Sequence, residues 1–357
     1  MRKKRALETD ILASRQVGAA SATHPAYWVY DHFPLPLPNR HRYPRNRFRI
    51  VRETLLAEGV LSAARLHRAR PEDWDTLALA HDADYLAQVR EGRLSARAVR
   101  EIGLPFSPQL VERARAAVFA TRQAVFRALD DGVACVIGGG THHAFAGRGA
   151  GYCLFNDIAV AIRGLRSRNQ QSRNQQSRNR QSHNQQIPNQ RSRDLQNRHR
   201  IHRAAIVDLD VHQGNGSAEL FGNDPGVFTF SLHGEKNWPH RKAAGDFDLG
   251  LPDGTGDAEY LAALEPPLVE MLERFRPELV CYLAGADPLH SDRLGRLALT
   301  HEGLRRRDAL VLGLCHERAI PVAVTLGGGY GQPMEDTIAV HLNTVREVER
   351  LWGGALP

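Results

Sequence analysis

A short segment near the middle of the chain places two carboxylates and an imidazole at alternate positions. The apolar residues Ile206 and Val207 lead into Asp208, Asp210 and His212. Because residues i and i+2 of an extended strand point to the same side, the three side chains are predicted to face one site at the end of a strand. Carboxylate oxygens and an imidazole nitrogen suit zinc, and a catalytic zinc takes three protein ligands and leaves one position open.

A third metal ligand must come from elsewhere in the chain. Asp287 ends another predicted strand in the sequence Ala-Gly-Ala-Asp, and it is the natural candidate. One neutral His and two carboxylates would leave zinc formally neutral and still able to polarise a carbonyl. A lone Asp at such a position is usually a helix N-cap, but beside Asp210 and His212 the ligand interpretation is favoured.

Two adjacent histidines, His142 and His143, follow the Gly-rich end of a further strand. Hydrolysis needs a base for the water and an acid for the leaving group. Neighbouring residues of an extended segment diverge, so each His is expected to serve one of these needs. Asp208 can orient one of them and Asn215 the other, and a carboxylate raises the pKa of its His more than an amide does. The alternative is a structural His pair within a Gly-rich turn.

Tyr330 follows three glycines, which let the backbone pass close to a ligand. Its hydroxyl could donate a hydrogen bond to a developing oxyanion. The alternative is a Tyr packed over a turn.

These groups need a sheet to position them, and the chain alternates strand and helix patterns. That alternation predicts a single α/β domain with a doubly wound, mainly parallel sheet flanked by helices. Ligands of such sheets bind outside the carboxyl ends of the strands, where all the candidate residues fall. Strands are predicted at 133–137, 204–210, 227–233, 279–284 and 321–326; helices at 108–130, 257–275, 301–318 and 335–351, with another from 156 and a loop after 227–233.

The net charge of +7 is concentrated in one segment. Residues 166–203 hold ten Arg and one Asp, a net +9, so the rest of the chain carries −2. Residues 167–190 repeat the pattern Gln-Ser-Arg-Asn with almost no apolar side chains, which predicts a disordered insert. A nucleic-acid groove would interleave aromatic and basic residues, so no nucleic-acid binding by the core is expected. A basic contact surface is the alternative for the insert.

The four cysteines lack Cys-x-x-Cys spacing, which argues against a disulfide framework and favours a reducing compartment. No apolar run approaches about 18 residues, so no membrane span is expected. Residues 1–23 lack the apolar core of a secretory signal and are predicted to be a disordered extension, with an organelle-targeting peptide as the alternative. A cytoplasmic protein is expected.

Six motifs in order along the chain resemble those of the zinc-dependent histone deacetylase superfamily, within the arginase/deacetylase fold. The Gln-Gly-Asn form at 213–215 and the segment 233–239 resemble its class IV-type and bacterial branch. The resemblance implies a deacetylase domain over residues 24–351, in which the repeat insert has no counterpart. The motifs are GGGTHHA (138–144), GYCLFND (151–157), VDLDVHQGNG (207–216), FSLH (230–233), AGAD (284–287) and LGGGY (326–330).

The resemblance also implies a role for each matching residue. Asp210, His212 and Asp287 would bind zinc, although the same ligands accept iron(II). The acid–base groups would be His142 as general base with Asp208, His143 as general acid or electrostatic partner beside Asn215, and Tyr330 polarising the substrate carbonyl.

Two further sites follow from the same resemblance. The Gly151 carbonyl, the Tyr152 ring and Trp238 would line an acyl-lysine tunnel. A structural potassium ion would bind at Asp208, Asp210, His212, Ser231 and Leu232.

The predicted function is therefore a zinc hydrolase that removes an acyl group, first of all acetyl, from lysine side chains of proteins. The alternatives are a deacetylase of small amines such as acetylpolyamines, a long-chain lysine deacylase, and a non-catalytic acyl-lysine binding module. An arginase-like enzyme with two manganese ions is disfavoured because the segment after Asp287 lacks the second Asp of an Asp-x-Asp pair. The sequence leaves the substrate and the oligomeric state open.

Overall fold

The computed structural model describes residues 24–38, 40–167 and 199–353. The predicted N-terminal extension (1–23) and most of the predicted insert (166–203) lie outside the described residues. Among the helices that are described, none is long and apolar enough to cross a membrane.

One sheet organises the described part of the chain, and all of its strand pairs are parallel. Its eight strands run in the spatial order β2-β1-β3-β8-β7-β4-β5-β6. Because the strands are parallel, their carboxyl ends share one edge, and the predicted doubly wound parallel sheet is confirmed. The strands are β1 (Ala26–Val29), β2 (Leu66–Arg68), β3 (Val133–Val136), β4 (Ala204–Asp208), β5 (Val227–Gly234), β6 (Phe247–Leu251), β7 (Leu279–Leu283) and β8 (Val322–Thr325).

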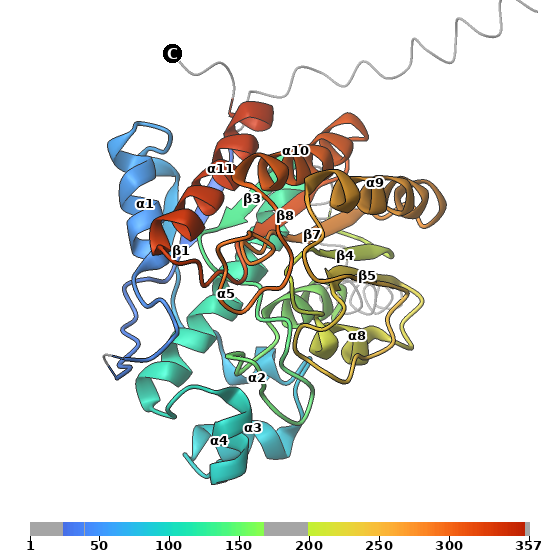
Figure 1. Ribbon diagram of the computed structural model, residues 1–357. Helices are drawn as coiled ribbons and strands as arrows, with labels where there is room; N and C mark the ends of the chain where they lie inside the picture. The colour runs from blue at the N-terminus through green and yellow to red at the C-terminus, as the bar shows by residue number, and fades with distance from the viewer. Residues whose placement is uncertain (1–23, 39, 168–198, 354–357) are drawn as a thin grey trace, which may run out of the picture.

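Helices cover both faces of the sheet (Figure 1). One face carries α1 (Arg47–Ala57), α9 (Asp257–Arg274), α10 (His301–Glu317) and α11 (Met334–Trp352). The other carries α5 (Pro108–Asp131), a helix at residues 157–167 and the short helices α2 (Trp74–Leu77), α3 (Ala83–Arg90) and α4 (Ala96–Ile102). The remaining helix, α8 (Asn215–Phe221), lies between β4 and β5 in the chain.

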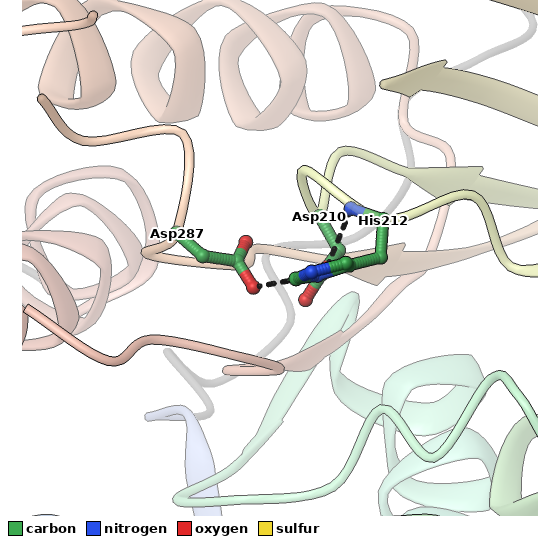
Figure 2. A group of neighbouring side chains, drawn as sticks. All are labelled: Asp210, His212 and Asp287. Carbon is green, nitrogen blue, oxygen red and sulfur yellow. Dashed lines mark hydrogen bonds and ion pairs between the residues drawn. The ribbon is translucent and has the colours of Figure 1, made fainter. Parts of the chain in front are cut away.

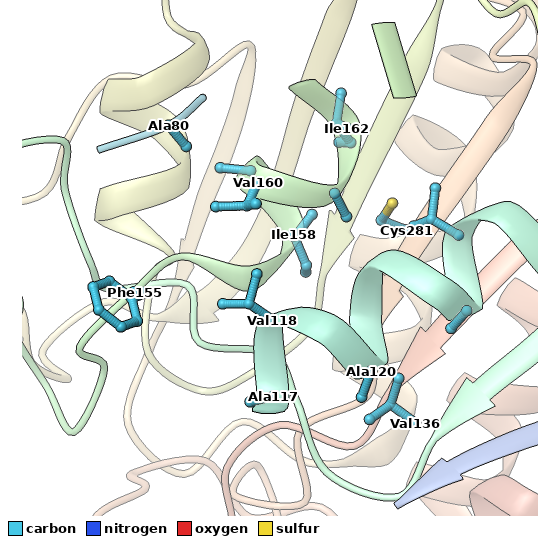
Figure 3. Packing of buried hydrophobic residues seen from close by; sticks show 14 of the residues in the cluster. Ala80, Ala117, Val118, Ala120, Val136, Phe155, Ile158, Val160, Ile162 and Cys281 are labelled. Atoms are coloured by element: carbon cyan, nitrogen blue, oxygen red, sulfur yellow. The ribbon is translucent and has the colours of Figure 1, made fainter. Parts of the chain in front are cut away.

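Alternation along the central strands divides the core into two layers. In β7, Leu279, Cys281 and Leu283 pack into one buried apolar layer. Val280 and Tyr282 pack into the other. Figure 3 shows the first layer, where residues of α5 and of the helix at 157–167 meet Val136 and Cys281 of the sheet. Strands buried on both faces read as continuous apolar runs, which is why the sequence revealed them.

The long helix α5 shows how local signals set element boundaries. Its N-cap Ser107 accepts a hydrogen bond from the Leu110 N–H (3.1 Å), and Pro108 occupies the first turn. Gly132 ends the helix with a φ of 86°, which a glycine adopts without strain. The other predicted strands and helices agree with the structure to within two residues.

Four parts of the fold differ from the prediction, and the first is the short helices α1 to α4 and α8, which were not predicted. The N-terminal strands β1 and β2 were not predicted, since they are only four and three residues long. The segment after β5 was predicted as a loop, but it contains β6, an edge strand that pairs with β5 alone. The strand predicted to reach residue 210 ends at Asp208, because side-chain carboxylates cap the backbone beyond it.

Candidate active site

A cavity of about 500 Å³ opens at the edge where the strands β3, β4, β7 and β8 end. Every predicted catalytic or zinc-binding residue except Asp208 and Asn215 lines it, and those two contact its histidines from behind. The candidate residues that line the cavity are His142, His143, Gly151, Tyr152, Asp210, His212, Trp238, Asp287 and Tyr330.

Asp210, His212 and Asp287 converge from two loops (Figure 2). The His212 Nδ1 lies 3.0 Å from Asp210 Oδ1 and 3.3 Å from Asp287 Oδ2. One ligand atom of each residue lies within 4.8 Å of the others. Asp287 Oδ2 is buried without a hydrogen-bond donor, and burial with the charge of Asp210 raises the pKa of Asp287 to about 7. These crowded anionic oxygens fit a divalent cation.

Backbone N–H groups fix the remaining oxygens of these carboxylates. The Gly328 N–H donates to Asp210 Oδ2 (2.9 Å), and the Val211 N–H donates to Asp287 Oδ1 (2.9 Å). A Cβ at position 328 would overlap both carboxylates, so the Gly-rich loop after β8 can approach the site only with glycine there. The other two carboxylate oxygens, Asp210 Oδ1 and Asp287 Oδ2, therefore face His212.

The Asp-x-Asp-x-His segment reaches this arrangement by another route than an extended strand. Beyond Asp208 the chain bends, with Asp208 Oδ1 accepting from the Asp210 N–H (3.2 Å) and Asp210 Oδ1 accepting from the His212 N–H (2.9 Å). The strand geometry assumed from the sequence was therefore wrong after Asp208. The three residues still meet at one site because these successive carboxylate turns replace the strand.

His142 and His143 hold different partners, as the sequence suggested. His142 Nδ1 lies 2.6 Å from Asp208 Oδ2, and His143 Nδ1 lies 3.0 Å from Asn215 Oδ1. The two rings do not diverge as expected for extended neighbours, since they lie in a turn with centroids 3.9 Å apart. The expectation that adjacent residues separate was wrong, and both imidazoles face the same cavity.

These partners make the two histidines electrostatically unlike. Burial opposes a charge on His142, but the carboxylate of Asp208 outweighs burial and raises the pKa of His142 to about 9. Burial and the neighbouring charge of His142 lower the pKa of His143 well below its ordinary value. The neutral amide of Asn215 does not offset that effect.

A polar network that the sequence did not reveal holds the loop carrying the histidines. Asp157 accepts hydrogen bonds from the Gly140 N–H (2.9 Å) and the Thr141 N–H (2.8 Å). His81 joins the Asn156 N–H (3.0 Å) to the carbonyl of Phe145 (2.9 Å). The sequence pattern indicated only that Asn156 and Asp157 begin a helix. Their role in this hydrogen-bond network could not be predicted, because their partners lie in other segments of the chain.

The loop after β8 that carries Tyr330 is held in a similar way. The buried Arg47 donates to the carbonyls of Gly327 (2.9 Å) and Gly329 (2.6 Å). Asp292 accepts a hydrogen bond from the Tyr330 N–H (2.5 Å). Burial raises the pKa of Tyr330 well above its ordinary value, so its hydroxyl is a donor at neutral pH.

A second buried arginine reaches the metal-site loops from α10. Arg307 Nη1 donates to the carbonyls of Gly285 (2.6 Å) and Leu209 (3.2 Å), which lie next to the metal-site residues in the chain. Its charge is balanced by Asp308, 2.7 Å away. The sequence gave no signal for this contact, since an Arg within a helix is ordinary.

The predicted tunnel residues form the mouth of the cavity. The ring of Trp238 lies edge-on to His143 with centroids 4.5 Å apart, and 37% of Trp238 is exposed. Gly151 lies between them, and a Cβ there would collide with both His143 and Trp238. Tyr152 contacts the ring of Tyr330 at 5.9 Å between centroids. The mouth is therefore lined by aromatic rings that lie close to the two catalytic candidates His143 and Tyr330.

The predicted potassium residues are adjacent across two strands. Asp208 of β4 is in register with Ser231 of β5, and Leu232 follows Ser231. Potassium at this position stays a prediction.

Comparison with known proteins identifies the family. The histone deacetylase domain model matches residues 41–174 and 192–345. The chain belongs to the histone deacetylase family. The gap between the matched segments falls within the predicted insert.

Relatives of this deacetylase-family chain span most of its length. An uncharacterised protein of Picosynechococcus sp. is 40% identical over 86% of this chain and 92% of its own. Histone deacetylase 2 of Arabidopsis thaliana is 28% identical over 90% of this chain and 77% of its own. Polyamine deacetylase HDAC10 of Homo sapiens is 30% identical over 73% of this chain but only 38% of its own.

Solved structures agree in fold. A histone deacetylase homologue complexed with SAHA superimposes with a TM-score of 0.71 at 24% identity, covering 94% of this chain and 86% of the homologue. A homologue from Aquifex aeolicus gives a TM-score of 0.70 at 23% identity over the same shares. The predicted arginase/deacetylase fold is confirmed.

Membership of the family makes the chain a deacetylase-type amide hydrolase. The family is generally zinc-dependent, and the Asp210–His212–Asp287 group could hold such an ion.

Proposed function

We propose that this deacetylase uses zinc and removes acetyl groups from lysine side chains of proteins. The observation that supports this most directly is the juxtaposition at the cavity floor. Three metal-binding side chains lie beside two histidines with unlike partners, below a mouth with aromatic walls. An acylated lysine presents an uncharged amide at the end of a slender aliphatic chain, which suits such a mouth.

Zinc held by Asp210, His212 and Asp287 would supply Lewis-acid polarisation of the acyl carbonyl and acidify a water molecule. The chain's own groups would complete the reaction. Tyr330 donates a hydrogen bond to the carbonyl oxygen as negative charge develops there. His142, backed by Asp208, would accept the proton of the attacking water, because the positive charge of a bound divalent ion would lower the pKa of His142 from its value beside Asp208 alone. The lowered pKa of His143 keeps its ring neutral, so beside Asn215 it would assist the leaving amine electrostatically, or protonate it after receiving the proton from His142.

The aromatic walls of the mouth would orient the substrate. The Tyr152 ring and Trp238 pack along the aliphatic stem, and the Gly151 carbonyl accepts a hydrogen bond from the substrate amide. A potassium ion would hold the carboxyl ends of the neighbouring strands β4 and β5 together beneath the predicted zinc ligands. It would bind at Asp208, Asp210, His212, Ser231 and Leu232.

Turnover on a panel of substrates tests this function. Zinc-loaded protein is expected to release acetate from an acetyl-lysine peptide faster than it cleaves a myristoyl-lysine peptide or acetylputrescine, and a chelator should abolish the release. Tyr330→Phe and His142→Ala should each lower kcat by at least about 100-fold with zinc retained. Near wild-type rates in either variant would disprove the assigned mechanism. Zinc binding without any turnover would favour an acyl-lysine binding module.

A substrate with a different leaving group distinguishes the roles of His142 and His143. The acetyl ester of a phenol needs no proton on its leaving group, so it should restore turnover to His143→Ala but not to His142→Ala. The opposite result would exchange the two roles.

A further inference from the structure

Four exposed arginines, Arg42, Arg100, Arg148 and Arg293, line the cavity or the hollow next to it and are here called the basic rim. Arg100 and Arg148 line the cavity itself. Arg42 and Arg293 line a smaller hollow of about 250 Å³ beside Tyr330.

The backbone fixes Arg100 close to the tunnel wall. The last turn of α4, which carries Arg100, accepts two hydrogen bonds from the Gly151–Tyr152 segment. The Gly151 N–H donates to the Glu101 carbonyl (3.1 Å), and the Tyr152 N–H donates to the Ile102 carbonyl (2.7 Å). Arg100 is therefore carried by a helix turn that is hydrogen-bonded to the wall of the mouth.

The segments that carry Arg42 and Arg293 also contact residues of the site. The Arg293 N–H donates to the carbonyl of Tyr330 (3.3 Å). Arg42 precedes Tyr43, whose ring contacts Tyr152 at 5.7 Å between centroids. The rim charges are thus carried by segments that touch the residues of the tunnel.

Carboxylates do not neutralise these charges. Within the described residues, none of the four rim arginines forms an ion pair. Arg148 lies over the Phe145 ring (3.5 Å to its centroid), and Arg293 donates to the amide of Gln332 (3.3 Å).

Two of the three acidic residues considered near the mouth, Glu101 and Asp292, are engaged elsewhere. Glu101 pairs with Arg97 at 2.9 Å. Asp292 is buried and accepts hydrogen bonds from backbone N–H groups, including that of Tyr330. Asp82 lies beside Gly147, yet it makes no ion pair with Arg148. Of these three carboxylates, only Asp82 is exposed without an ion-pair partner among the described residues, so the four rim arginines outnumber it and the mouth carries net positive charge.

We propose that the basic rim selects acyl-lysine substrates whose flanking residues are acidic. The inference rests on the proposed deacylase function, because only a lysine inserted in the tunnel brings its neighbours to the rim. A cluster of like charges around an aromatic cleft raises the local concentration of oppositely charged ligands. It also repels a lysine in a basic sequence and the cationic chain of an acylated polyamine.

Steady-state turnover of three acetyl-lysine peptides with acidic, neutral or basic flanks tests the rim. Wild-type protein should show a kcat/KM about tenfold higher for acidic than for basic flanks at low salt, and the ratio should shrink as ionic strength rises. The double variant Arg100→Glu/Arg148→Glu should invert the ratio. Arg274→Glu makes the same kind of charge change on the exposed end of α9, remote from the mouth, and should leave the ratio unchanged.

Fluorescence anisotropy of labelled acidic and basic peptides on zinc-loaded protein gives a readout that needs no catalysis. Turnover without flank preference, or a preference that survives in the double variant, would overturn the rim proposal and leave the deacylase function intact. If no peptide were cleaved, the proposed function would fail. Equal binding of the two labelled peptides would then reject the rim as well.

Discussion

At the floor of the cavity, Asp210 and Asp287 accept hydrogen bonds from backbone N–H groups and lie beside the imidazole of His212. At the rim, by contrast, four exposed arginines have no carboxylate partner among the residues that the structure describes. The floor residues come from the ends of parallel strands, and the rim residues come from loops and a short helix. The buried floor therefore has one possible geometry, while the rim can change without disturbing the fold.

The floor and the rim therefore have different roles: the floor carries out the reaction, and the rim selects the substrate. Buried groups in a low dielectric interact strongly, so the floor fixes the reaction. Exposed charges are screened and each contributes little, so the rim affects which substrates arrive and how fast. Substitutions should accordingly act most strongly at the floor and progressively less in the residues behind it.

The largest effect is expected from Asp287→Asn. Replacing one anionic ligand by a neutral amide should lower zinc affinity by at least about 100-fold and deacetylation by at least about 1,000-fold. A titration with a chromophoric zinc chelator, together with kcat/KM on an acetyl-lysine peptide, measures both.

Asp292→Asn is the matched control, because Asp292 is also a buried carboxylate near the site but contacts Tyr330 rather than the metal group. It should slow turnover while zinc affinity stays within a few-fold of wild type. Equal zinc affinity in the two variants would show that Asp287 is not a ligand.

A smaller effect is expected from Arg307→Lys. The lysine keeps the buried charge next to Asp308 but cannot bridge the Leu209 and Gly285 carbonyls as the planar guanidinium does. The loops carrying the metal ligands should lose order, and zinc affinity should fall by about 10- to 100-fold.

Thr344→Val separates that loss from general destabilisation. Thr344 donates to Asp308 Oδ2 (2.6 Å), whereas Arg307 donates to Asp308 Oδ1, so loss of the Thr344 hydroxyl should lower Tm with little change in zinc affinity. If both variants lost zinc affinity in proportion to Tm, Arg307 would be a fold residue only.

The smallest effect is expected from His81, through pH. Burial lowers the pKa of His81 to about 4, whereas the unfolded chain has an ordinary His pKa of about 6.5. Above about pH 6.5 this difference in pKa does not lower the free energy of unfolding. As the pH falls towards 4 the free energy of unfolding decreases, because the unfolded chain gains a proton on His81 and the folded chain does not. The loss is about 1 kcal/mol at pH 5.5.

Urea unfolding of wild type and His81→Gln at pH 7.5 and 5.5 isolates this residue, since other buried histidines contribute equally to both proteins. The variant should lose less stability on acidification than wild type. An identical loss would mean that His81 accepts a proton in the folded state.

The strand-end residues of the site could be predicted because parallel strands gather their carboxyl ends at one edge, whatever the intervening sequence. Residue type suggested that Asp208 and Asn215 would hold the two histidines, since the motif at 207–216 offers a carboxylate and an amide. Only the family resemblance assigned Asp208 to His142 and Asn215 to His143. Arg47, His81, Asp292 and Arg307 could not be predicted in this way. Each is a single residue whose contacts lie in another part of the chain.

The same distinction applies to the fold. The central strands β3, β4, β7 and β8 are buried on both faces and read as apolar runs. The segments before α5 form two short strands and four helices of at most 11 residues, too short for their periodicity to stand out. The chain path beyond Asp208 depends on hydrogen bonds from side chain to backbone, which alternation cannot reveal.

Because the strands all run in one direction, the amino ends of the strands lie at the edge of the sheet opposite the candidate site. The residues that flank the 168–198 segment meet there, where Arg166 pairs with Asp224 and a Cβ at Gly226 would touch both Arg166 and His202. Extra sequence joined at this corner enters and leaves the domain beside the start of β5, remote from the cavity mouth. For protein engineers, the same corner is a ready insertion point for a fluorescent reporter or an affinity tag within the chain.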